Sequence, residues 1–433
     1  MCNAQEKKVM INPDVYGFAT SNTFTYFNVD DTVFSNKVKK INPNVLRFPG
    51  GAMGNFYHFN KNGYGFDFEE IEKFCKGSRF IERSKSLERA NIQRGHTHDY
   101  IDDFIKLAKM TNSKVVLVAN MFVDNDDIIK MIDKIQSNEL EILGVELGSE
   151  LSNRSFYLNQ YTINEYIKDA RSCSEKIKYY FPEIKTAIVA APLHESLSHR
   201  HSIWNNRLSD LDFYDAIIIH SYAKVVKGKK EYGQMITVEN EGSNEEEAFD
   251  LYKKRTLNFL NSTFIKEVGT YNEIFGDPIW ITEWNLQISH KTGNTLLQSL
   301  FISQYFLELM SNKDLQNITL TNYHNLAGRD YGGSIFRYTK KIQEIQSTYY
   351  PLTLIGKIFD YNIVVIEKEI SNKIYTYKCF DEMQVLVFSF EVDWDSHLFK
   401  FNFNGITKIF TSDNLFDKVH SNGFFKIDSE IKN

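Results

Sequence analysis

Two glutamates stand in short polar segments that each follow an apolar run. Glu150 comes shortly after the run Leu143–Leu147, and Glu283 follows the run Ile279–Thr282. Two carboxyl groups can divide the hydrolysis of a glycosidic bond, because one protonates the leaving oxygen while the other attacks the anomeric carbon. Enzymes that retain the anomeric configuration hold these carboxyls about 5–5.5 Å apart. The alternative for each glutamate is structural, since strand-end acids often cap the next helix or pair with arginine.

Eight short apolar runs, alternating with longer amphipathic segments, must position these glutamates. Helical spacing is clear in Tyr100–Met110 and Asp126–Ile135, where apolar residues recur at i, i+3 and i+4. Such alternation predicts parallel βα units, and eight of them fit a closed (β/α)8 barrel of roughly 250 residues or more. A doubly wound open sheet is the alternative. The expected strands are Val15–Ala19, Val45–Phe48, Lys114–Asn120, Leu143–Leu147, Ala187–Ala191, Ala216–His220, Ile279–Thr282 and Ile318–Tyr323.

The sequence pattern changes after the helix-like segment Tyr349–Phe359, where the alternation of apolar runs and amphipathic segments ends. Short runs rich in β-branched and aromatic residues follow, with no long helix between them, and this pattern predicts a small antiparallel β-domain. We therefore expect a catalytic barrel over residues 10–355 and a β-sandwich over residues 356–433, which the N-terminal residues could complete. The expected tail strands are Asn362–Ile366, Ile374–Cys379, Val385–Phe390, Leu398–Phe403 and Lys408–Phe410.

The composition excludes several classes of function. The net charge of −6 over 433 residues argues against a general nucleic-acid binder, which usually has a basic excess. No apolar run reaches the roughly 18 residues that a transmembrane helix needs. The four cysteines are scattered without a CxxC pair, which argues against a zinc site or a disulfide framework. In the run His96–Asp99, Asp99 is explained as the N-cap of the helix from Tyr100. The sequence thus predicts neither a metal nor a cofactor.

The first residues suggest a location for the protein. Met1-Cys2-Asn3 resembles the end of a mature lipoprotein, with a start methionine in place of a removed signal and a lipid anchor on Cys2. An extracellular, periplasmic or surface-anchored protein is therefore expected. The alternative is a cytoplasmic protein in which Cys2 is an ordinary second residue. The Lys-, Asn-, Ile- and Phe-rich composition, with only 7 prolines, is typical of an AT-rich bacterial genome.

Four polar segments at strand ends carry a resemblance to a known group of enzymes. They are Leu46–Gly51, Gly148–Glu150, His220–Tyr222 and Ile279–Asn285. Their order and spacing resemble clan A of the glycoside hydrolases, in particular the family 51 arabinofuranosidases, the family 39 enzymes and the family 79 glucuronidase and heparanase group. The resemblance covers roughly residues 10–360, and the tail resembles the companion β-sandwich. It implies a (β/α)8 barrel whose catalytic acids follow strands four and seven.

Carried over to this sequence, the resemblance assigns roles to five residues. It implies Glu150 as general acid/base and Glu283 as nucleophile of a retaining double displacement. Arg47 would lie beside Glu283 and keep it ionised, since a nearby cation lowers a carboxyl pKa. Tyr222 would donate a hydrogen bond to Glu283. His220 would orient the substrate or the acid/base.

Other residues at the expected barrel mouth are candidates for contacts with a sugar. Trp284 or Trp280 would stack on a sugar ring, His194 follows the fifth expected strand and His324 the eighth. One position departs from the resemblance, because the clan usually has Asn directly before the acid/base and this chain has Ser149. Asn120 or Asn153 could then contact the sugar 2-hydroxyl, or the substrate could be substituted there, or Glu150 is not the acid.

Basic residues cluster near the expected mouth, although the whole chain is acidic. Arginine and lysine bind carboxylate or sulfate groups through charge-assisted hydrogen bonds, which favours an anionic glycan as substrate. The alternative is a solvated surface, since acids such as Glu82 and Glu88 are interspersed. The residues in question are Lys76, Arg79, Arg83, Lys85, Arg89, Arg94, His96, His98, His194, Arg200, His201, Lys224, Lys227, Lys229 and Lys230.

The preferred hypothesis is therefore that the protein is a glycoside hydrolase that cleaves a polysaccharide or oligosaccharide. A second hypothesis is a non-catalytic glycan-binding protein on a degenerate barrel, which Ser149 favours. A third is a polysaccharide lyase that uses His220 and Tyr222 to abstract a proton next to a uronate carboxyl group. In all three the partner is a carbohydrate.

Overall fold

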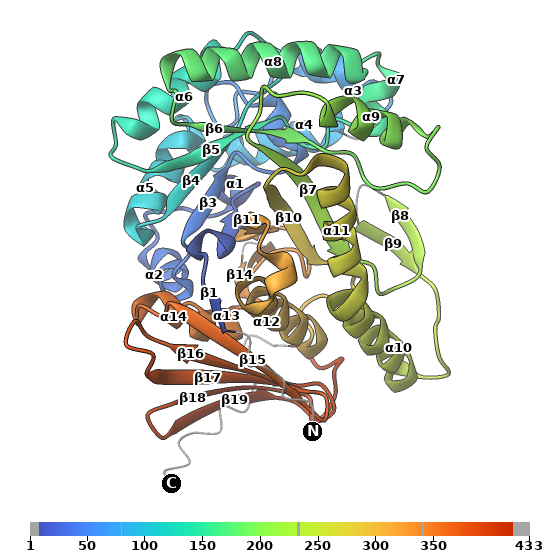
Figure 1. Ribbon diagram of the computed structural model, residues 1–433. Coiled ribbons are helices and arrows are strands. Elements are labelled where there is room, and N and C mark those ends of the chain that lie inside the picture. The colour runs from blue at the N-terminus through green and yellow to red at the C-terminus, as the bar shows by residue number, and fades with distance from the viewer. Residues whose placement is uncertain (1–7, 79, 232–233, 340–341, 419–433) are drawn as a thin grey trace.

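The computed structural model describes residues 8–78, 80–231, 234–339 and 342–418. Its centre consists of eight parallel strands: β2 Gly17–Ala19, β3 Val45–Phe48, β4 Lys114–Val118, β5 Ile142–Leu147, β6 Lys185–Val189, β7 Ala216–Ala223, β10 Ile279–Leu286 and β11 Ile318–Tyr323. They close into a barrel in the order β10-β11-β2-β3-β4-β5-β6-β7 (Figure 1). The predicted barrel is confirmed, and the open sheet is wrong.

Each strand falls on one of the eight apolar runs, with small differences at the ends. The clearest is at the first strand, where Pro13–Val15 forms a 3-10 turn capped by the Asn12 side chain, so β2 begins only at Gly17. Near-continuous apolar runs suit these strands because a parallel sheet inside a ring of helices is buried on both faces.

Helices surround the barrel. They are α1 Thr23–Tyr26, α2 Thr32–Ile41, α3 Phe68–Cys75, α4 Phe80–Gln93, α5 Tyr100–Thr111, α6 Asp126–Gln136, α7 Arg154–Leu158, α8 Ile163–Tyr180, α9 Arg200–Ser209, α10 Glu245–Asn258, α11 Phe264–Phe275, α12 Leu296–Ser311, α13 Tyr349–Ile355 and α14 Lys357–Asp360. Asp99 accepts a hydrogen bond from the Ile101 N–H and caps α5, as predicted. Helices α10 and α11, which follow β7, are joined by a π-helical turn at Phe259–Thr263.

A second sheet follows the barrel in the chain. Its strands are β1 Lys8–Met10, β15 Val365–Ser371, β16 Ile374–Phe380, β17 Leu386–Asp393, β18 Leu398–Phe403 and β19 Ile406–Thr411. They pair antiparallel in the order β1-β15-β16-β17-β18-β19, so an antiparallel C-terminal β-domain is confirmed. The N-terminal strand β1 extends this sheet through β15. The end of the expected domain, residues 419–433, lies outside the described residues.

The sheet packs against the barrel through α12, as Figure 1 shows. Every residue of α12 is buried, because one side of the helix faces the barrel and the other faces the sheet. Gln304 and Glu308 accept hydrogen bonds from Trp394 and Tyr377 across this contact. In its described part the β-domain is thus one sheet whose buried face is covered by a barrel helix.

Two smaller sheets lie in connections at the C-terminal end of the barrel. A hairpin of β8 Gly228–Glu231 and β9 Gln234–Val238 follows β7, and a three-stranded sheet of β12 Ala327–Gly328, β13 Phe336–Thr339 and β14 Ile342–Ile345 follows β11. Neither sheet was predicted from the sequence. Both extend the wall around the mouth of the barrel.

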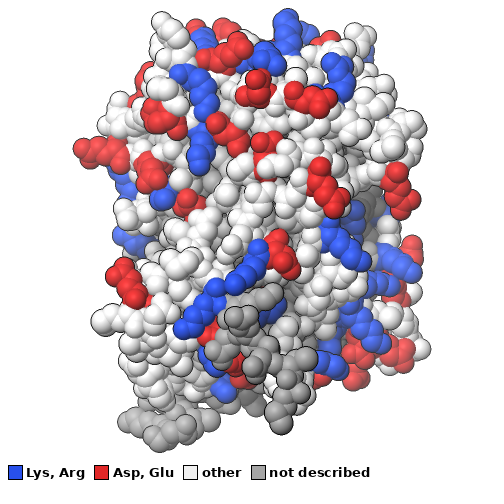
Figure 2. Space-filling model, in the orientation of Figure 1, with Lys and Arg blue, Asp and Glu red and all other residues white. Residues whose placement is uncertain are grey.

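Several whole-chain expectations can be compared with the structure. Acidic and basic side chains are interspersed over the face shown in Figure 2. Among the described helices, none is long and apolar enough to cross a membrane. Cys75, Cys173 and Cys379 are buried free thiols. Cys2, the predicted lipid attachment site, lies outside the described residues.

Candidate active site

Glu150 and Glu283 meet at the C-terminal end of the barrel. Glu150 follows β5 and Glu283 lies near the end of β10, the fourth and seventh strands of the barrel. One carboxylate oxygen from each glutamate and one ring nitrogen of His220 all lie within 4.8 Å of one another. The pairing of β10 with β7 shifts register between Ile281 and Glu283, and such a bulge re-aims the side chains that follow it.

Among the described residues, three side chains lie within about 3.1 Å of the carboxylate of Glu283, which is only 6% exposed, and His220 lies slightly further away, with its Nδ1 3.7 Å from Oε2. The Arg47 Nη1 donates to Oε1 at 2.9 Å, and the Tyr222 hydroxyl donates to Oε2 at 3.0 Å. The Nδ1 of His324 lies 3.1 Å from Oε2. The three residues come from β3, β7 and the end of β11, so only the closed barrel brings them together.

These neighbours keep Glu283 ionised. Burial by itself would raise the pKa of Glu283, but the charges of His220, His324 and Arg47 outweigh it and hold that pKa well below its usual range. Burial raises the pKa of Tyr222 far above its ordinary value, and the negative charge of Glu283 raises it further. Tyr222 therefore stays protonated and donates its hydrogen to the carboxylate.

A buried ion pair below Glu283 fixes Arg47 in place. The Arg47 Nε and Nη2 donate to the two carboxylate oxygens of Glu146 at 2.5 and 2.8 Å, and both side chains are fully buried. Thr282 donates to the same carboxylate at 3.1 Å. Sequence reasoning missed Glu146, although an acid inside the apolar run of β5 is itself a signal, because a buried carboxylate needs a partner.

Glu150 has a more open environment. Its side chain is 36% exposed, and its Oε1 lies 3.1 Å from the Nδ1 of His220. Asn153 donates to Oε2 at 3.2 Å. The backbone of Glu150 has φ 53°, a left-handed conformation that costs a non-glycine residue roughly 1–2 kcal/mol.

The residue before Glu150 is held from both sides by Asn55. The Ser149 N–H donates to Asn55 Oδ1 at 2.8 Å, and the Asn55 amide donates to the Ser149 carbonyl at 2.7 Å. Ser149 is fully buried, and its hydroxyl accepts a hydrogen bond from Arg47 at 3.3 Å. Ser149, a substrate-binding candidate because it stands where the clan usually has Asn, therefore supports the site from beneath and does not face the opening.

A cavity of about 600 Å³ opens beside Glu150. It lies between the ends of β6 and β7, helix α10 and the π-helical turn, and Glu150, His220 and Tyr222 form part of its wall. Glu267 on α11 lines the far side and accepts a hydrogen bond from Ser221 at 3.0 Å, while its burial raises its pKa. The sequence analysis had not identified Glu267. Of the two paired glutamates, Glu150 is the one that lines this cavity.

The expected stacking of tryptophan on a sugar is wrong. The Trp284 side chain is fully buried on the outer side of the barrel, between β10 and helix α12. There its ring stacks on Tyr305 at 4.0 Å, and its Nε1–H donates to Thr321. Because alternate residues of a strand face opposite sides, Glu283 facing the site sends Trp284 toward the helices. Trp280 is 3% exposed and fills the barrel interior, where a Cβ on Gly144 would lie 2.4 Å from its ring.

Two more candidates lie apart from the catalytic pair. Asn120 is buried, and its amide donates to Glu70 while its oxygen accepts from the Phe122 N–H. His194 is exposed in the loop after β6, where its ring stacks on His199 at 3.7 Å. Neither contacts Glu150 or Glu283, so the expected role in sugar binding is not supported for them. Asn153 does line the cavity.

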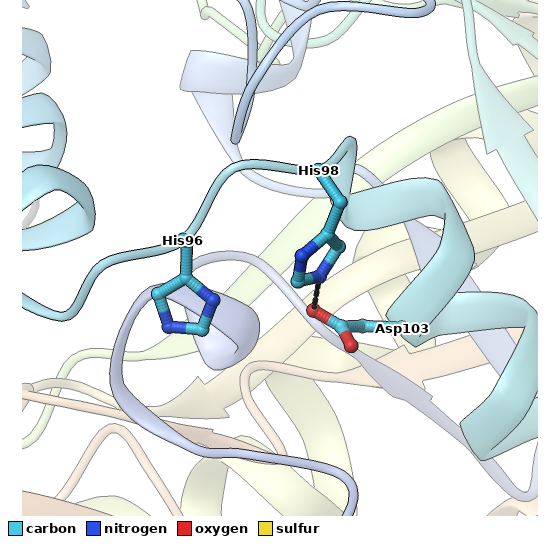
Figure 3. A group of neighbouring side chains, drawn as sticks. All are labelled: His96, His98 and Asp103. Carbon is cyan, nitrogen blue, oxygen red and sulfur yellow. Dashed lines mark hydrogen bonds and ion pairs between the residues drawn. The ribbon is translucent and has the colours of Figure 1, made fainter.

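The described residues hold two groups of side chains whose donor atoms are close enough to share a metal ion. One group consists of Glu150, His220 and Glu283, in which the His220 ring lies against both carboxyl groups. The other is His96, His98 and Asp103, beside α5, where His98 bonds to Asp103 at 2.8 Å (Figure 3). His96 already accepts a hydrogen bond from Arg94 at 3.2 Å, and this guanidinium would repel a cation.

Comparisons with known proteins agree with this architecture. No protein-family model matches the sequence, and no curated protein matches it either. Among solved structures, a family 51 α-L-arabinofuranosidase from Bifidobacterium longum superposes with a TM-score of 0.63 at 11% identity, covering 98% of this chain and 92% of the other. An α-L-arabinofuranosidase from Thermotoga maritima gives 0.53 at 16% identity, over 94% and 83% of the two chains. A family 51 α-L-arabinofuranosidase from Thermotoga petrophila gives 0.53 at 15% identity, over 94% and 84%. At these identities the likeness shows a shared fold.

Proposed function

We propose that this protein is a retaining glycoside hydrolase, with Glu150 as general acid/base and Glu283 as nucleophile. The observation that carries the proposal is the separation of the two carboxyls, whose nearest oxygens lie within 4.8 Å of one another. Retaining enzymes place these groups about 5–5.5 Å apart, whereas inverting enzymes leave about 6.5–9.5 Å for a water molecule. The fold likeness to arabinofuranosidases supports a carbohydrate substrate.

The reaction follows from this arrangement in two steps. In the first, a carboxylate oxygen of Glu283 bonds to the anomeric carbon, the bond to the leaving oxygen breaks, and Glu150 transfers its proton to that oxygen. In the second, a water oxygen bonds to the anomeric carbon as the bond to Glu283 breaks. Glu150 takes the proton of this water, which restores both carboxyls to their starting states.

The environments of the glutamates favour this assignment over the reverse one. A nucleophile must be ionised, and Glu283 is surrounded by donors and positive charge. A general acid/base must exchange protons with a leaving group and then with water, and Glu150 lines the cavity with a partly exposed side chain. The cavity on its side is then the place for the leaving portion of the substrate.

The other two hypotheses fit the site less well. In a lyase, Tyr222 or His220 would remove a proton, but Tyr222 donates to Glu283 and its pKa is raised, which makes it a poor base. A binding protein has no need for a buried carboxylate held by Arg47, Tyr222 and His324. The network around Glu283 therefore favours catalysis.

We also propose that the glycan is anionic, sulfated or uronate-containing. Lys224 lines the cavity, and Arg200, near Glu150, donates to the Ser152 carbonyl. Arg154 lies close enough to Arg200 that its charge, after burial, lowers the Arg200 pKa. In the part of the chain that the structure describes, none of these three cations is within ion-pairing distance of a carboxylate. Such unneutralised charge beside a site attracts anions.

The assignment can be tested by chemical rescue with azide. Wild type, Glu150→Ala and Glu283→Ala are assayed on neutral, uronate and sulfated polysaccharides and on small aryl glycosides. Azide should restore turnover to both variants, giving a glycosyl azide of retained configuration from Glu150→Ala and of inverted configuration from Glu283→Ala, as seen by NMR. If Glu283→Ala is as active as wild type, the proposed mechanism is wrong. Cleavage by wild type of only one polysaccharide class would identify the substrate.

A further inference from the structure

A group of arginines lies across the barrel mouth from the cavity beside Glu150. In the ring of eight strands, β11, β2 and β3 stand opposite β5, β6 and β7. Arg83 lies on α4 and Arg94 in the turn after it, both in the connection that follows β3. Arg329 comes directly after β12, in the connection that follows β11. Tyr26 ends α1, directly after β2, and packs among them. These residues therefore lie on the catalytic face, on the side away from the cavity.

Two stacked tyrosines hold this arginine group together. The rings of Tyr26 and Tyr338 stack with centroids 5.6 Å apart. The Arg329 guanidinium lies 5.6 Å from the Tyr26 ring, and the Arg94 guanidinium lies 5.6 Å from the Tyr338 ring. Arg94 also donates to the Tyr26 carbonyl at 2.6 Å. Cations held on aromatic faces in this way lose less freedom when they bind a ligand.

The charges of this group are not neutralised within the described chain. Arg83, Arg94 and Arg329 are not within ion-pairing distance of any described carboxylate, whereas Arg47, Arg255 and Arg337 are. Acids lie nearby: the charge of Asp330 acts on Tyr26, and Asp103, which is bonded to His98 (Figure 3), is acted on by the charge of Arg94. Arg329 lies over the Tyr26 ring, and the charges of Arg329 and Arg83 both lower the pKa of the Tyr26 hydroxyl, which burial raises.

Converging guanidinium groups are well suited to one kind of ligand. Each presents a planar fork of donors that matches the two oxygens of a carboxylate or the oxygens of a sulfate. Arg83 and Arg329 are exposed and accessible to a ligand, with Arg329 also lying over Tyr26, while Arg94 is half-buried and held by Tyr26 and His96. An overall charge of −6 makes a nucleic-acid partner less favourable than a glycan at this face.

We propose that Arg83, Arg94 and Arg329, supported by Tyr26 and Tyr338, bind carboxylate or sulfate groups of the glycan on the nucleophile side of the barrel mouth. The inference rests on the proposed function. There, the cavity beside Glu150 takes the leaving part of the glycan, and the opposite side of the mouth takes the part that becomes bonded to Glu283. A glycan that spans both sites extends in both directions from the scissile bond. The enzyme then cleaves within a chain and releases oligosaccharides.

The test measures binding without catalysis. Heparin, polygalacturonate and dextran serve as sulfated, carboxylated and neutral probes in titration calorimetry with the Glu283→Gln protein. Arg83→Gln with Arg329→Gln changes only exposed side chains, and its folding is checked by thermal unfolding. Arg171→Gln is the matched control, because Arg171 also lies over an aromatic ring, Phe213 at 4.7 Å, without a carboxylate partner, and it is on α8.

We expect one anionic probe to bind, with at least about tenfold weaker affinity in the double variant and unchanged affinity in the control, given the strength of hydrogen bonds to charged groups. The bound probe distinguishes sulfate from carboxylate, and dextran should not bind. Equal affinity in double variant and parent, binding of neither anionic probe, or tighter binding of a DNA duplex would each overturn the proposal. Binding with no azide rescue would instead count against the hydrolase assignment and leave the anion site standing.

Discussion

Glu150 and Glu283 are the same residue type at the same end of one barrel, but their surroundings differ in almost every respect. Glu283 is 6% exposed and lies against Arg47, Tyr222 and His324, whereas Glu150 is 36% exposed and lines an open cavity. Glu283 lies within strand β10, just after a bulge, while the backbone of Glu150 is left-handed. The comparison teaches that the division of work between two carboxyls is set by charge and access around each, and not by the residue itself.

The strongest test of this difference removes the charge of Glu283. In Glu283→Gln the nucleophile is lost, and kcat should fall on the order of 10⁵-fold or more, as for other covalent catalysts. The measurement is the initial rate of reducing-end release. Glu175→Gln on α8, an exposed acid far from the site in the fold, is the control and should behave as wild type.

Removing the proton of Glu150 should have a smaller and substrate-dependent effect. We expect Glu150→Gln to lose about 10²–10⁴-fold in kcat/KM on natural glycans, the usual contribution of acid–base catalysis. With a 4-nitrophenyl glycoside the first step should be nearly unaffected, because that leaving group needs no proton. Equal losses on both kinds of substrate would contradict the role of Glu150 as the acid.

The ion pair beneath Glu283 is expected to contribute to stability. Glu146→Gln leaves the buried Arg47 with one carboxylate partner fewer, and we expect the free energy of unfolding to fall by about 3–5 kcal/mol. Guanidinium chloride denaturation measures it. Glu391→Gln, which removes a half-exposed contact with Lys400 at 3.9 Å, should cost less than about 1 kcal/mol.

The pKa of Glu283 can be moved without touching the glutamate. His324→Gln removes the imidazole whose Nδ1 lies 3.1 Å from the Glu283 carboxylate and helps to lower the Glu283 pKa, so that pKa should rise and the acid limb of kcat/KM should move to higher pH. The lowered pKa of Glu283 also stabilises the folded protein, and this part of the free energy of unfolding is lost as the pH falls through the folded-state pKa. In the His324→Gln protein, the free energy of unfolding should therefore begin to fall at a higher pH than in wild type. An acid limb that stays in place would show that His324 does not hold Glu283 ionised.

The smallest effect is expected at the open side of the pair. Asn153→Ala removes one hydrogen bond, at 3.2 Å, from the partly exposed Glu150. Because solvent can replace that bond, kcat/KM should fall less than about tenfold. A loss as large as that of Glu150→Gln would mean that Asn153 itself contacts the substrate.

The sequence by itself determined the barrel strands and the position of the two glutamates at their ends. Apolar runs of strand length, separated by amphipathic segments, predicted all eight barrel strands, because burial in a parallel sheet requires such runs. Polar residues after those runs must then lie at one face. The resemblance to clan A placed Arg47, Tyr222 and His220 beside the glutamates, and the structure puts each within contact of one of them. His324, expected only to contact a sugar, also lies beside Glu283.

Only the tertiary structure decided which way side chains face and which distant residues meet. Simple alternation along β10 would put Trp280 and Trp284 on one side, but the bulge before Glu283 sends Trp284 outward. The partner of Glu146 comes from another strand, 99 positions away, and no local pattern records it. The arginine group likewise draws on separate connections of the barrel. Local physics sets where strands begin and end, whereas contacts across the barrel depend on closure and register, which short stretches of sequence do not specify.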